Sequence, residues 1–500
     1  MKFLLFKSSY ILTEGRALIR FYSIVLFFML ATNLSFSDDD IFKHSLQCDM
    51  TQIYEDEPQE VTTFSDMFCN GIFYGRLRAH SFSFLWEDEV TGKRENSHIA
   101  ALGGSIIYKS AYLNGFAVTA GLYTTHAKGS LSEDESALYK AGKDTFNRYS
   151  LLSGGNGSIT SLAQAYLEYK YNESYIRVGR QIYTTFLTKS NDTKMIPNTF
   201  EGISLVSKII PNTIISMAYL LKQKLRDHSD FHHVFAYGDS KSDPYARYSE
   251  NDDSAMHRGI TLSKLREKKI DDRLFVFEVK NGSIDNLAIR MNYTTVPKLI
   301  SYMMLQAEYR FEIYDWSVMP GFRYMKQFDD GAGSLAGANL KEKTKGYTNA
   351  DSLDAALYGA RVDIVNDAFK LRFGYTKTSD EADIVTPWRG FPTAGFTRAM
   401  SQYNWYANTQ SYMVQLDYEF ENVEDFKILT RFVVQDFDDS KIGVQADSKV
   451  FTFDAVKSFP EQSISFKTRF AHVTGHEQHS AFTKANPSYD EVRFEINYLF

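Results

Sequence analysis

Arginine alternates with apolar residues along many segments of this 500-residue chain. In one such segment, Leu287, Ile289 and Met291 stand on either side of Arg290. Arginine stays charged at any relevant pH, and its planar guanidinium binds carboxylates through two parallel hydrogen bonds. A column of arginines along a pore would therefore attract anionic solutes and pass them from site to site. The arginine column predicted by this alternation consists of Arg76, Arg78, Arg177, Arg290, Arg310, Arg323, Arg361, Arg372, Arg431, Arg469 and Arg493.

Acidic residues share the register of the arginine column, so some of these cations are expected to be structural. A carboxylate facing a guanidinium across a strand pair would cancel its charge. We expect about half of the arginines to be neutralised in this way, without knowing which half. The acids in that register are Glu168, Glu308, Asp363, Asp417, Glu419, Asp454 and Glu495.

The elements that position these side chains are predicted to be β-strands. Runs of 9 to 13 residues alternate apolar with polar side chains, which is the period of a strand with one lipid-facing side. Short connectors such as 112–115 and 281–283 alternate with long ones such as 127–160 and 378–410. The pattern predicts an all-β fold, a transmembrane antiparallel β-barrel of about 18 strands with short periplasmic turns and long outer loops. The predicted strands are 72–84, 99–110, 116–126, 161–171, 174–183, 200–210, 213–222, 271–281, 286–295, 301–311, 315–327, 353–364, 368–377, 411–420, 425–436, 447–457, 463–473 and 491–500.

Composition agrees with a barrel and disfavours other classes. Tyr (32) and Phe (39) are abundant, whereas the mean hydropathy is negative at -0.32. A helical membrane protein would need several apolar runs of 18 or more residues, and none occurs beyond the N-terminus. The net charge of -7 argues against a nucleic-acid partner, which requires a basic footprint.

The N-terminal region divides into two segments ahead of a single barrel domain, 72–500. Residues 1–37 combine a basic start, an apolar stretch and small residues before Asp38, and are predicted to be a signal peptide. A retained anchor helix is the alternative. The acidic segment 38–71 holds Cys48 and Cys69, which would meet an oxidising compartment after export. They form a possible disulfide, or else two unpaired thiols.

The C-terminal strand ends on Phe500, with Tyr498 on the same face. An aromatic C-terminal residue on an alternating strand is the pattern that the barrel-assembly machinery is thought to read. Together with the leader, it predicts localisation in the bacterial outer membrane, with outer-membrane lipids as partners.

Other reactive patterns are weak, and we predict no catalytic residue, no metal and no cofactor. The histidines of Gly475-His476-Glu477-Gln478-His479 are three residues apart, whereas the metalloprotease helix motif needs four. His228, His232 and His233 fall in a predicted outer loop, where histidines are more often merely exposed. Nothing resembles a nucleophile with a paired base, so an enzyme is not expected.

Several segments resemble the OprD-type family of substrate-specific outer-membrane porins. The most specific block runs from Ala165-Tyr166-Leu167-Glu168-Tyr169-Lys170 through 177–181 to Asp192 and 195–202. Residues 387–393 and, less specifically, 64–79 are also similar to that family.

The resemblance implies a monomeric barrel that passes small solutes, often amino acids or other carboxylates, by diffusion. In that family the third outer loop narrows the lumen, and an arginine ladder guides the substrate carboxylate. Here that loop corresponds to 184–199, which puts Asp192 and Asn198 near the constriction, with Trp388 and Arg389 contributing from the loop before 411. Two departures are Thr184-Thr185-Phe186, where a proline would be expected, and the acidic segment, which is longer than usual. That segment would either plug the periplasmic mouth or be disordered.

We therefore expect a passive porin for small solutes, carboxylate-bearing ones in particular, with a narrow arginine-lined pore. The alternative is an adhesin or structural barrel whose lumen is blocked. A lipid hydrolase would need a Ser/His pair near the lipid edge. An energy-coupled receptor would need a plug of over a hundred residues, which the short N-terminal segment cannot supply.

Overall fold

The computed structural model describes residues 44–47, 49–240, 242–243, 258–400 and 402–500. The predicted signal peptide and Cys48 lie outside the described residues. Cys69 is free and exposed, and its pairing with Cys48 stays a prediction. Among the described residues, no helix is long and apolar enough to cross a membrane.

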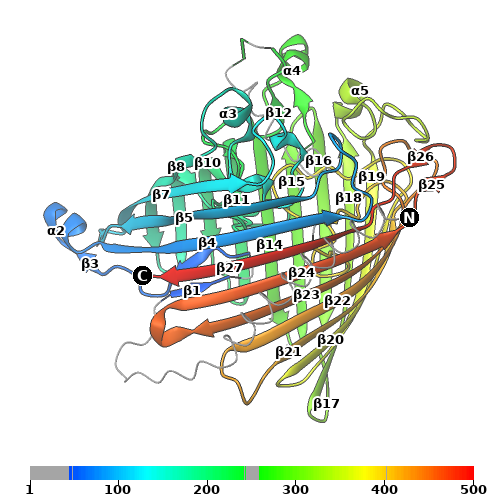
Figure 1. Ribbon diagram of the computed structural model, residues 1–500. Coiled ribbons are helices and arrows are strands. Elements are labelled where there is room, and N and C mark those ends of the chain that lie inside the picture. Colours follow the sequence, from blue (N-terminus) through cyan, green and yellow to red (C-terminus); the bar gives the residue numbers. More distant parts are fainter. Residues whose placement is uncertain (1–43, 48, 241, 244–257, 401) are drawn as a thin grey trace.

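Eighteen long strands form a closed antiparallel barrel (Figure 1). The first long strand, β4, pairs with the last, β27, in a register that sets Leu77 opposite Tyr498 and closes the ring. The eighteen strands are β4 (Ile72–Trp86), β5 (Ser97–Lys109), β7 (Phe116–Gly129), β8 (Ile159–Tyr171), β9 (Ser174–Gln181), β10 (Thr199–Ser207), β11 (Thr213–Lys224), β14 (Leu274–Ile284), β15 (Leu287–Val296), β16 (Ile300–Tyr309), β18 (Trp316–Asp329), β19 (Ala355–Val365), β20 (Phe369–Thr378), β21 (Gln410–Glu419), β22 (Phe426–Asp436), β23 (Ser448–Phe459), β24 (Ile464–Gly475) and β27 (Tyr489–Leu499).

Each predicted strand coincides with one of these eighteen, and only the ends move by a few residues. One predicted turn is wrong. Asn281-Gly282-Ser283 lies within β14, where the pairing with β15 shifts register between Asn281 and Ile284. The chain reverses at Asp285-Asn286 instead, and Asn286 takes the left-handed conformation with a φ of 63°. Asparagine tolerates that conformation, so it served as the turn residue in place of glycine.

Alternation places apolar side chains outside and polar side chains inside, as a strand with two different faces requires. On β20, Phe373 is 46% exposed on the outer surface, whereas its neighbour Arg372 is only 8% exposed. Tyr498 and Phe500 are likewise exposed on the outside. The exposed apolar side chains are the surface that lipid would cover.

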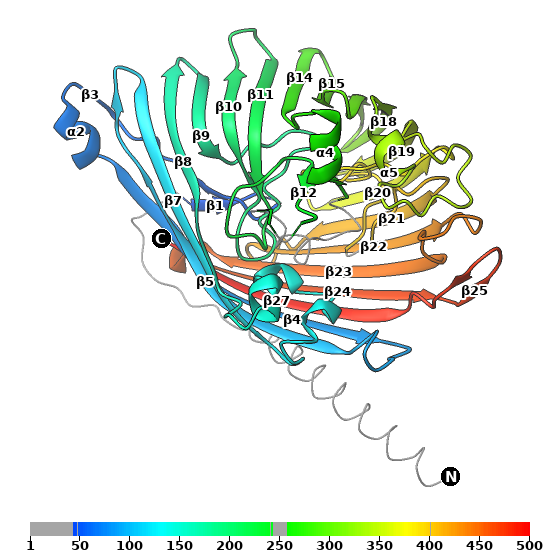
Figure 2. The same cartoon turned by 90° about the horizontal axis from the view of Figure 1, so that it is seen from above.

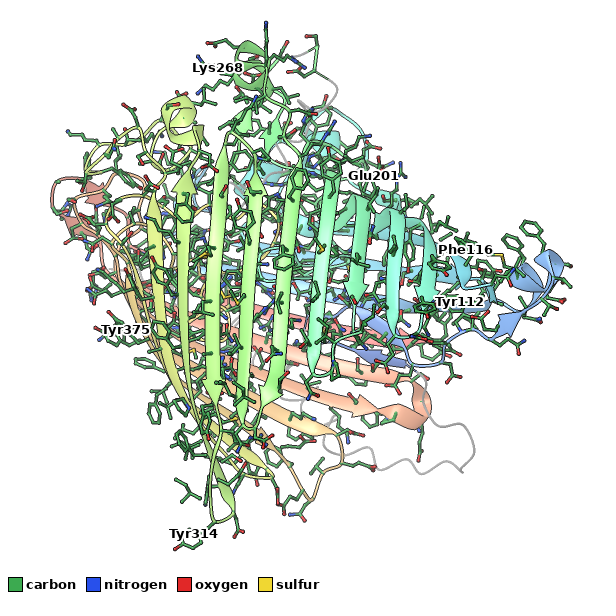
Figure 3. All side chains as sticks on the ribbon, turned by 180° about the vertical axis from the view of Figure 1, so that it is seen from behind. Tyr112, Phe116, Glu201, Lys268, Tyr314 and Tyr375 are labelled. Carbon is green, nitrogen blue, oxygen red and sulfur yellow. The ribbon has the colours of Figure 1, made fainter. Side chains whose placement is uncertain are left out.

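The two rims of the barrel differ in their connections. Short turns such as Asn114-Gly115, both with positive φ, close one rim, and long loops with short helices cover the other. Figure 3 shows Lys268 in a loop helix at one end of the barrel and Tyr314 at the tip of a hairpin at the other. The loop helices are α3 (Arg148–Leu152), α4 (Leu262–Lys268) and α5 (Ala332–Ala336), with 3-10 turns at Ser136–Leu138 and Lys143–Thr145; a further 3-10 turn, Pro460–Gln462, lies in a short connection at the opposite rim.

The remaining elements are short. The segment before the barrel contains β1 (His44–Leu46), β2 (Gln52–Tyr54), β3 (Glu60–Val61) and α2 (Phe64–Cys69). The pair β1–β2 is a separate two-stranded sheet, and Figure 2 shows β1 inside the ring of barrel strands. Short strands elsewhere are β6 (Tyr112–Leu113), β12 (Ala236–Tyr237), β13 (Ile260–Thr261), β17 (Phe311–Ile313), β25 (Gln478–His479) and β26 (Thr483–Lys484).

Candidate functional site: the lumen

A cavity of about 1840 Å³ occupies the barrel lumen. Its lining includes Asn366 and Pro460 from the short turns at the periplasmic rim, and Arg94 and Asn486 from the outer loops. The cavity therefore extends from the region of one rim to that of the other, as a permeation path requires.

The loop between β9 and β10 crosses the lumen. At one end, the backbone N–H of Phe186 donates to the Glu278 carboxylate on β14 at 2.7 Å. At the other end, Asp192 pairs with Arg76 and Arg78 of β4, and the Asp192–Arg78 contact measures 3.0 Å. Since β4 and β14 lie on opposite sides of the β9–β10 hairpin in the strand order, this loop spans from one wall to another.

A second loop, between β20 and β21, meets the first inside the barrel. Thr188 and Arg389 form an antiparallel β-bridge, and the N–H of Gly390 donates to the Leu187 carbonyl at 2.8 Å. The indole of Trp388 is fully buried and donates to the Val234 carbonyl at 2.8 Å. The structure thus brings together the two loops that the resemblance indicated.

The four predicted constriction residues have different places in this junction. Arg389 lines the cavity, and its guanidinium lies 3.8 Å from both the Asp144 and the Asp227 carboxylates. Asp192, Asn198 and Trp388 are buried behind the lining. The Asn198 side chain, for example, donates to the Lys189 carbonyl at 3.1 Å within the loop. These three therefore shape the loops and do not face the path.

Nine of the eleven arginines in the column have a carboxylate partner within 4.0 Å, so the expectation that about half are neutralised was too low. Arg372 binds both oxygens of Asp363 at 2.6 and 2.7 Å, and Arg469 contacts Asp454 at 2.8 Å. The antiparallel register places these partners opposite each other on neighbouring strands. The other partners are Asp192 for Arg76 and Arg78, Glu168 for Arg177, Glu278 for Arg290, Glu312 for Arg310, Glu308 for Arg361 and Glu491 for Arg493.

Arg323 and Arg431 have no carboxylate partner among the described residues. Arg323 donates to the Gln306 side chain and to the Pro392 and Ala394 carbonyls, the latter two at 2.7 and 2.9 Å. Arg431 donates to the Gln415 side-chain oxygen at 2.7 Å. Neutral acceptors satisfy hydrogen bonding without cancelling charge, so neither guanidinium group belongs to an ion pair on the cavity surface.

Strand alternation missed Arg398, which lines the cavity from the β20–β21 loop. Its guanidinium donates to the Gln402 carbonyl and lies 4.7 Å from the ring centroid of Phe391 and 5.2 Å from that of Tyr403. Burial lowers the pKa of Arg398 to about 10, so it remains charged at neutral pH. Because the residue belongs to an irregular loop, no periodic pattern in the sequence could have placed it in the lumen.

Six members of the column do not line the main cavity: Arg76, Arg78, Arg177, Arg310, Arg361 and Arg372. Arg310 follows β16 at the periplasmic rim, where its side chain is 51% exposed and lies 3.6 Å from Glu312. The prediction extended the apolar–polar alternation past the end of β16. The predicted position of Arg310 in the lumen is therefore wrong. Arg177 lines a second cavity of about 390 Å³ together with Glu57 and Lys170.

The main cavity is basic. Among the described residues, its lining contains sixteen lysines and arginines and seven aspartates and glutamates. Strands and loops both contribute to the excess, and the loop cations include Lys189 and Lys194 of the β9–β10 loop. An excess of fixed positive charge in a narrow aqueous path raises the local concentration of anions.

The barrel and its polar path define a channel protein of outer-membrane type. The sequence model described as "outer membrane porin, OprD family" matches residues 156–500. The chain therefore belongs to the OprD family, which consists of channels and not of enzymes. The match starts at β8, so the similarity noted for residues 64–79 lies outside it.

Solved structures with the same fold include proteins of two bacteria, Pseudomonas aeruginosa and Acinetobacter baumannii. OpdQ of Pseudomonas aeruginosa is 17% identical with a TM-score of 0.61, and covers 86% of this chain and 99% of its own. OpdK of the same species, solved with vanillate, is 13% identical with a TM-score of 0.64, covering 87% and 99%. OccAB3 of Acinetobacter baumannii is 12% identical with a TM-score of 0.66, covering 87% and 100%. At these identities the likeness concerns the fold alone. No curated protein sequence was found to match the chain.

Proposed function

We propose that this outer-membrane channel passes small solutes that carry a carboxylate, such as amino acids and organic acids, by passive diffusion. The observation that carries the proposal is the charge of the lumen. Arg323, Arg398 and Arg431 line the cavity without a carboxylate within 4.0 Å among the described residues, and so offer guanidinium groups outside ion pairs to a passing anion.

The three arginines belong to different parts of the wall, which suits transfer from one site to the next. Arg323 lies on β18, Arg431 on β22, and Arg398 in the loop that meets the β9–β10 loop. A solute carboxylate released from one guanidinium would find another ahead of it. Conduction by such a series requires each site to bind weakly enough for release.

Aromatic rings next to these arginines suggest how the uncharged part of a solute is accommodated. The Arg323 guanidinium lies 4.4 Å from the ring centroid of Phe396 and 5.0 Å from that of Phe186. Phe186 and Phe391 also line the cavity. A small organic acid would set its carboxylate on the cation and its apolar part against the rings. The structure of OpdK with vanillate, which carries both a carboxylate and a ring, is consistent with this arrangement.

The crossing loops are proposed to act as the constriction. Asp192 and Asn198 would hold the β9–β10 loop across the path, while Trp388 and Arg389 would support it from the β20–β21 loop. We further infer a monomer that inserts after export by the signal peptide 1–37, with Tyr498 and Phe500 read by the barrel-assembly machinery. Both aromatic side chains are exposed on the outer face of β27 or at its end, where such a reader has access.

The decisive experiment compares two matched solutes. Acetate and acetamide have nearly equal size, and differ in charge and in the ability to pair with a guanidinium. Proteoliposomes containing the folded barrel should swell faster in acetate than in acetamide. Planar-bilayer reversal potentials under a salt gradient should show anion preference.

The variant Arg323→Gln/Arg398→Gln/Arg431→Gln should bring the two swelling rates together and lower the anion preference. Equal rates for acetate and acetamide in the wild-type protein would refute carboxylate selectivity while leaving a general porin. An absence of any current from folded protein would refute the channel and favour the blocked barrel.

A further inference from the structure

A segment that precedes the barrel lies inside it. Residues 44–47 and 49–54 carry the strands β1 and β2, which within the described part of the chain pair only with each other, in a sheet separate from the barrel wall. Figure 2 shows β1 within the ring of barrel strands, and residues 45–47, 49 and 50 line the main cavity. This segment therefore occupies space that would otherwise belong to the lumen.

The segment is attached to the inner face of β4 at successive positions. The Met50 carbonyl accepts from Arg76 at 2.8 Å, and the Gln52 side chain donates to the Gly75 carbonyl at 2.7 Å. The Tyr54 ring stacks on that of Tyr74, with centroids 5.2 Å apart. Holding a chain segment in one conformation costs entropy, and these regularly placed contacts offset that cost along its length.

The same segment is tied to the loop that crosses the lumen. The Ser190 hydroxyl donates to the Asp49 carboxylate at 3.0 Å and also shares a hydrogen bond with the Thr51 hydroxyl. Arg76 joins both partners, because it binds the Met50 carbonyl of the segment and the Asp192 carboxylate of the loop. Segment and loop thus form one connected unit across this part of the barrel.

The two cavities lie at different parts of the segment. Asp49 and Met50 line the main cavity, whereas Glu57 lines the second cavity and contacts Lys170 of β8 there. Arg177 belongs to that second cavity. The N-terminal chain therefore contributes to the lining of both cavities.

We propose that residues 45–54 are a part of the selectivity wall of the channel. They narrow the main path from the β4 side, and the Asp49 carboxylate reduces the net positive charge of the lining. The inference rests on the proposed function only in requiring that the barrel conducts. In this proposal the segment ahead of the barrel narrows the permeation path, in addition to the barrel strands and the outer loops.

The test is the single-channel conductance of a variant that lacks residues 38–54 but keeps its signal peptide. Because Asp192 still holds Arg76 and Arg78, the crossing loop keeps an anchor in this variant. Its folding is checked by heat-modifiable migration on a gel. We expect a larger conductance, by a factor of about two, and a stronger preference for anions.

Two point variants separate the effect of volume from that of charge. Asp49→Asn should leave the conductance nearly unchanged and raise the anion-to-cation permeability ratio by about tenfold, as expected for one charge close to the path. Glu57→Gln is the matched control, because it removes the same charge from the same chain but outside the main cavity, and it should change neither quantity.

The outcomes distinguish this inference from the channel function itself. Conductance and selectivity unchanged by the deletion would overturn the inference and leave the channel intact. Current from the deletion variant alone would support the inference in its strongest form, with the segment closing the path. Silence of both folded proteins would overturn the channel and the inference together.

Discussion

Two groups of arginines lie on the inner face of the same barrel and differ in the groups that bind their guanidinium ions. Arg76 and Arg78 are buried against Asp192, and Glu495 adds a contact to Arg78 at 2.5 Å. Arg323 and Arg431 are held only by neutral oxygens. The first group forms ion pairs that fix a loop to the barrel wall, whereas the guanidinium groups of the second group are available to solutes in the pore. Residue type alone therefore does not tell a structural arginine from one available to a solute.

The largest expected effect comes from breaking the paired group. Asp192→Asn would leave two buried guanidinium groups with one remaining acidic partner, Glu495. Removing one member of a buried ion pair typically costs about 3–5 kcal/mol. We expect the β9–β10 loop to detach from β4, the barrel to unfold at a lower temperature on heat-modifiability gels, and the single-channel current to become larger and noisier.

Arg76→Gln in the same chain provides the control for this prediction. It removes one of the two cations that Asp192 compensated, so Asp192→Asn/Arg76→Gln should recover part of the lost thermal stability. Equal unfolding temperatures for wild type and Asp192→Asn would show that the buried cluster is not what holds the loop.

A smaller effect is expected from the uncompensated group, and neighbouring strands offer a matched pair. Arg431→Gln removes a free charge from the cavity wall. A unit charge about 6 Å from a passing ion in water contributes about 0.7 kcal/mol, which is roughly threefold in the permeability of that ion and roughly tenfold in the anion-to-cation ratio. Arg469→Gln/Asp454→Asn removes an ion pair from the same wall without changing the net charge, and should leave the reversal potential nearly unchanged. A larger shift of the reversal potential in the double variant than in Arg431→Gln would show that the ion pair, and not the unpaired arginine, determines the anion preference.

The protonation of Lys189 provides a test in which pH changes the charge of the cavity wall. Burial, with a further contribution from Arg290, lowers the pKa of Lys189 to about 8, while Asp49 and Glu278 oppose the shift. The lysine is therefore mostly charged at pH 7 and mostly neutral at pH 9. Since Lys189 lines the cavity, anion preference should fall as pH rises through 8. In Lys189→Met the preference should be lower at pH 7 and should change less between pH 7 and 9; an identical pH profile would exclude this residue.

The strands of this barrel were predictable because one physical rule acts along each of them. Lipid on one side and water on the other impose a period of two, and that period is visible in segments such as 369–375. The same rule placed Arg323, Arg431 and Arg469 on the cavity wall. It failed at the turn after β14, where Asn286 and not Gly282 takes the left-handed conformation.

The site was less predictable because much of it lies in loops and in pairings. Arg398 and Lys189 reach the cavity from segments without any period, so their positions depend on long-range contacts such as the Thr188–Arg389 bridge. The partners of the column depend on register and side-chain reach, which alternation does not specify. The placement of residues 44–47 and 49–54 in the lumen has no local signal in the sequence, because it arises from contacts with β4 and with Ser190.

The smallest expected effect concerns the arginine that alternation misplaced. Arg310 is half exposed at the periplasmic rim and contacts Glu312, which is also exposed. Exposed ion pairs of this kind contribute about 0–1 kcal/mol, and salt screens their field within roughly 8 Å at physiological ionic strength. Arg310→Ala should therefore leave the reversal potential and the acetate swelling rate within error of wild type, in contrast to Arg431→Gln. If Arg310→Ala lowered anion preference as much as Arg431→Gln does, then charge at the rim, and not the uncompensated arginines inside, would set the selectivity of the channel.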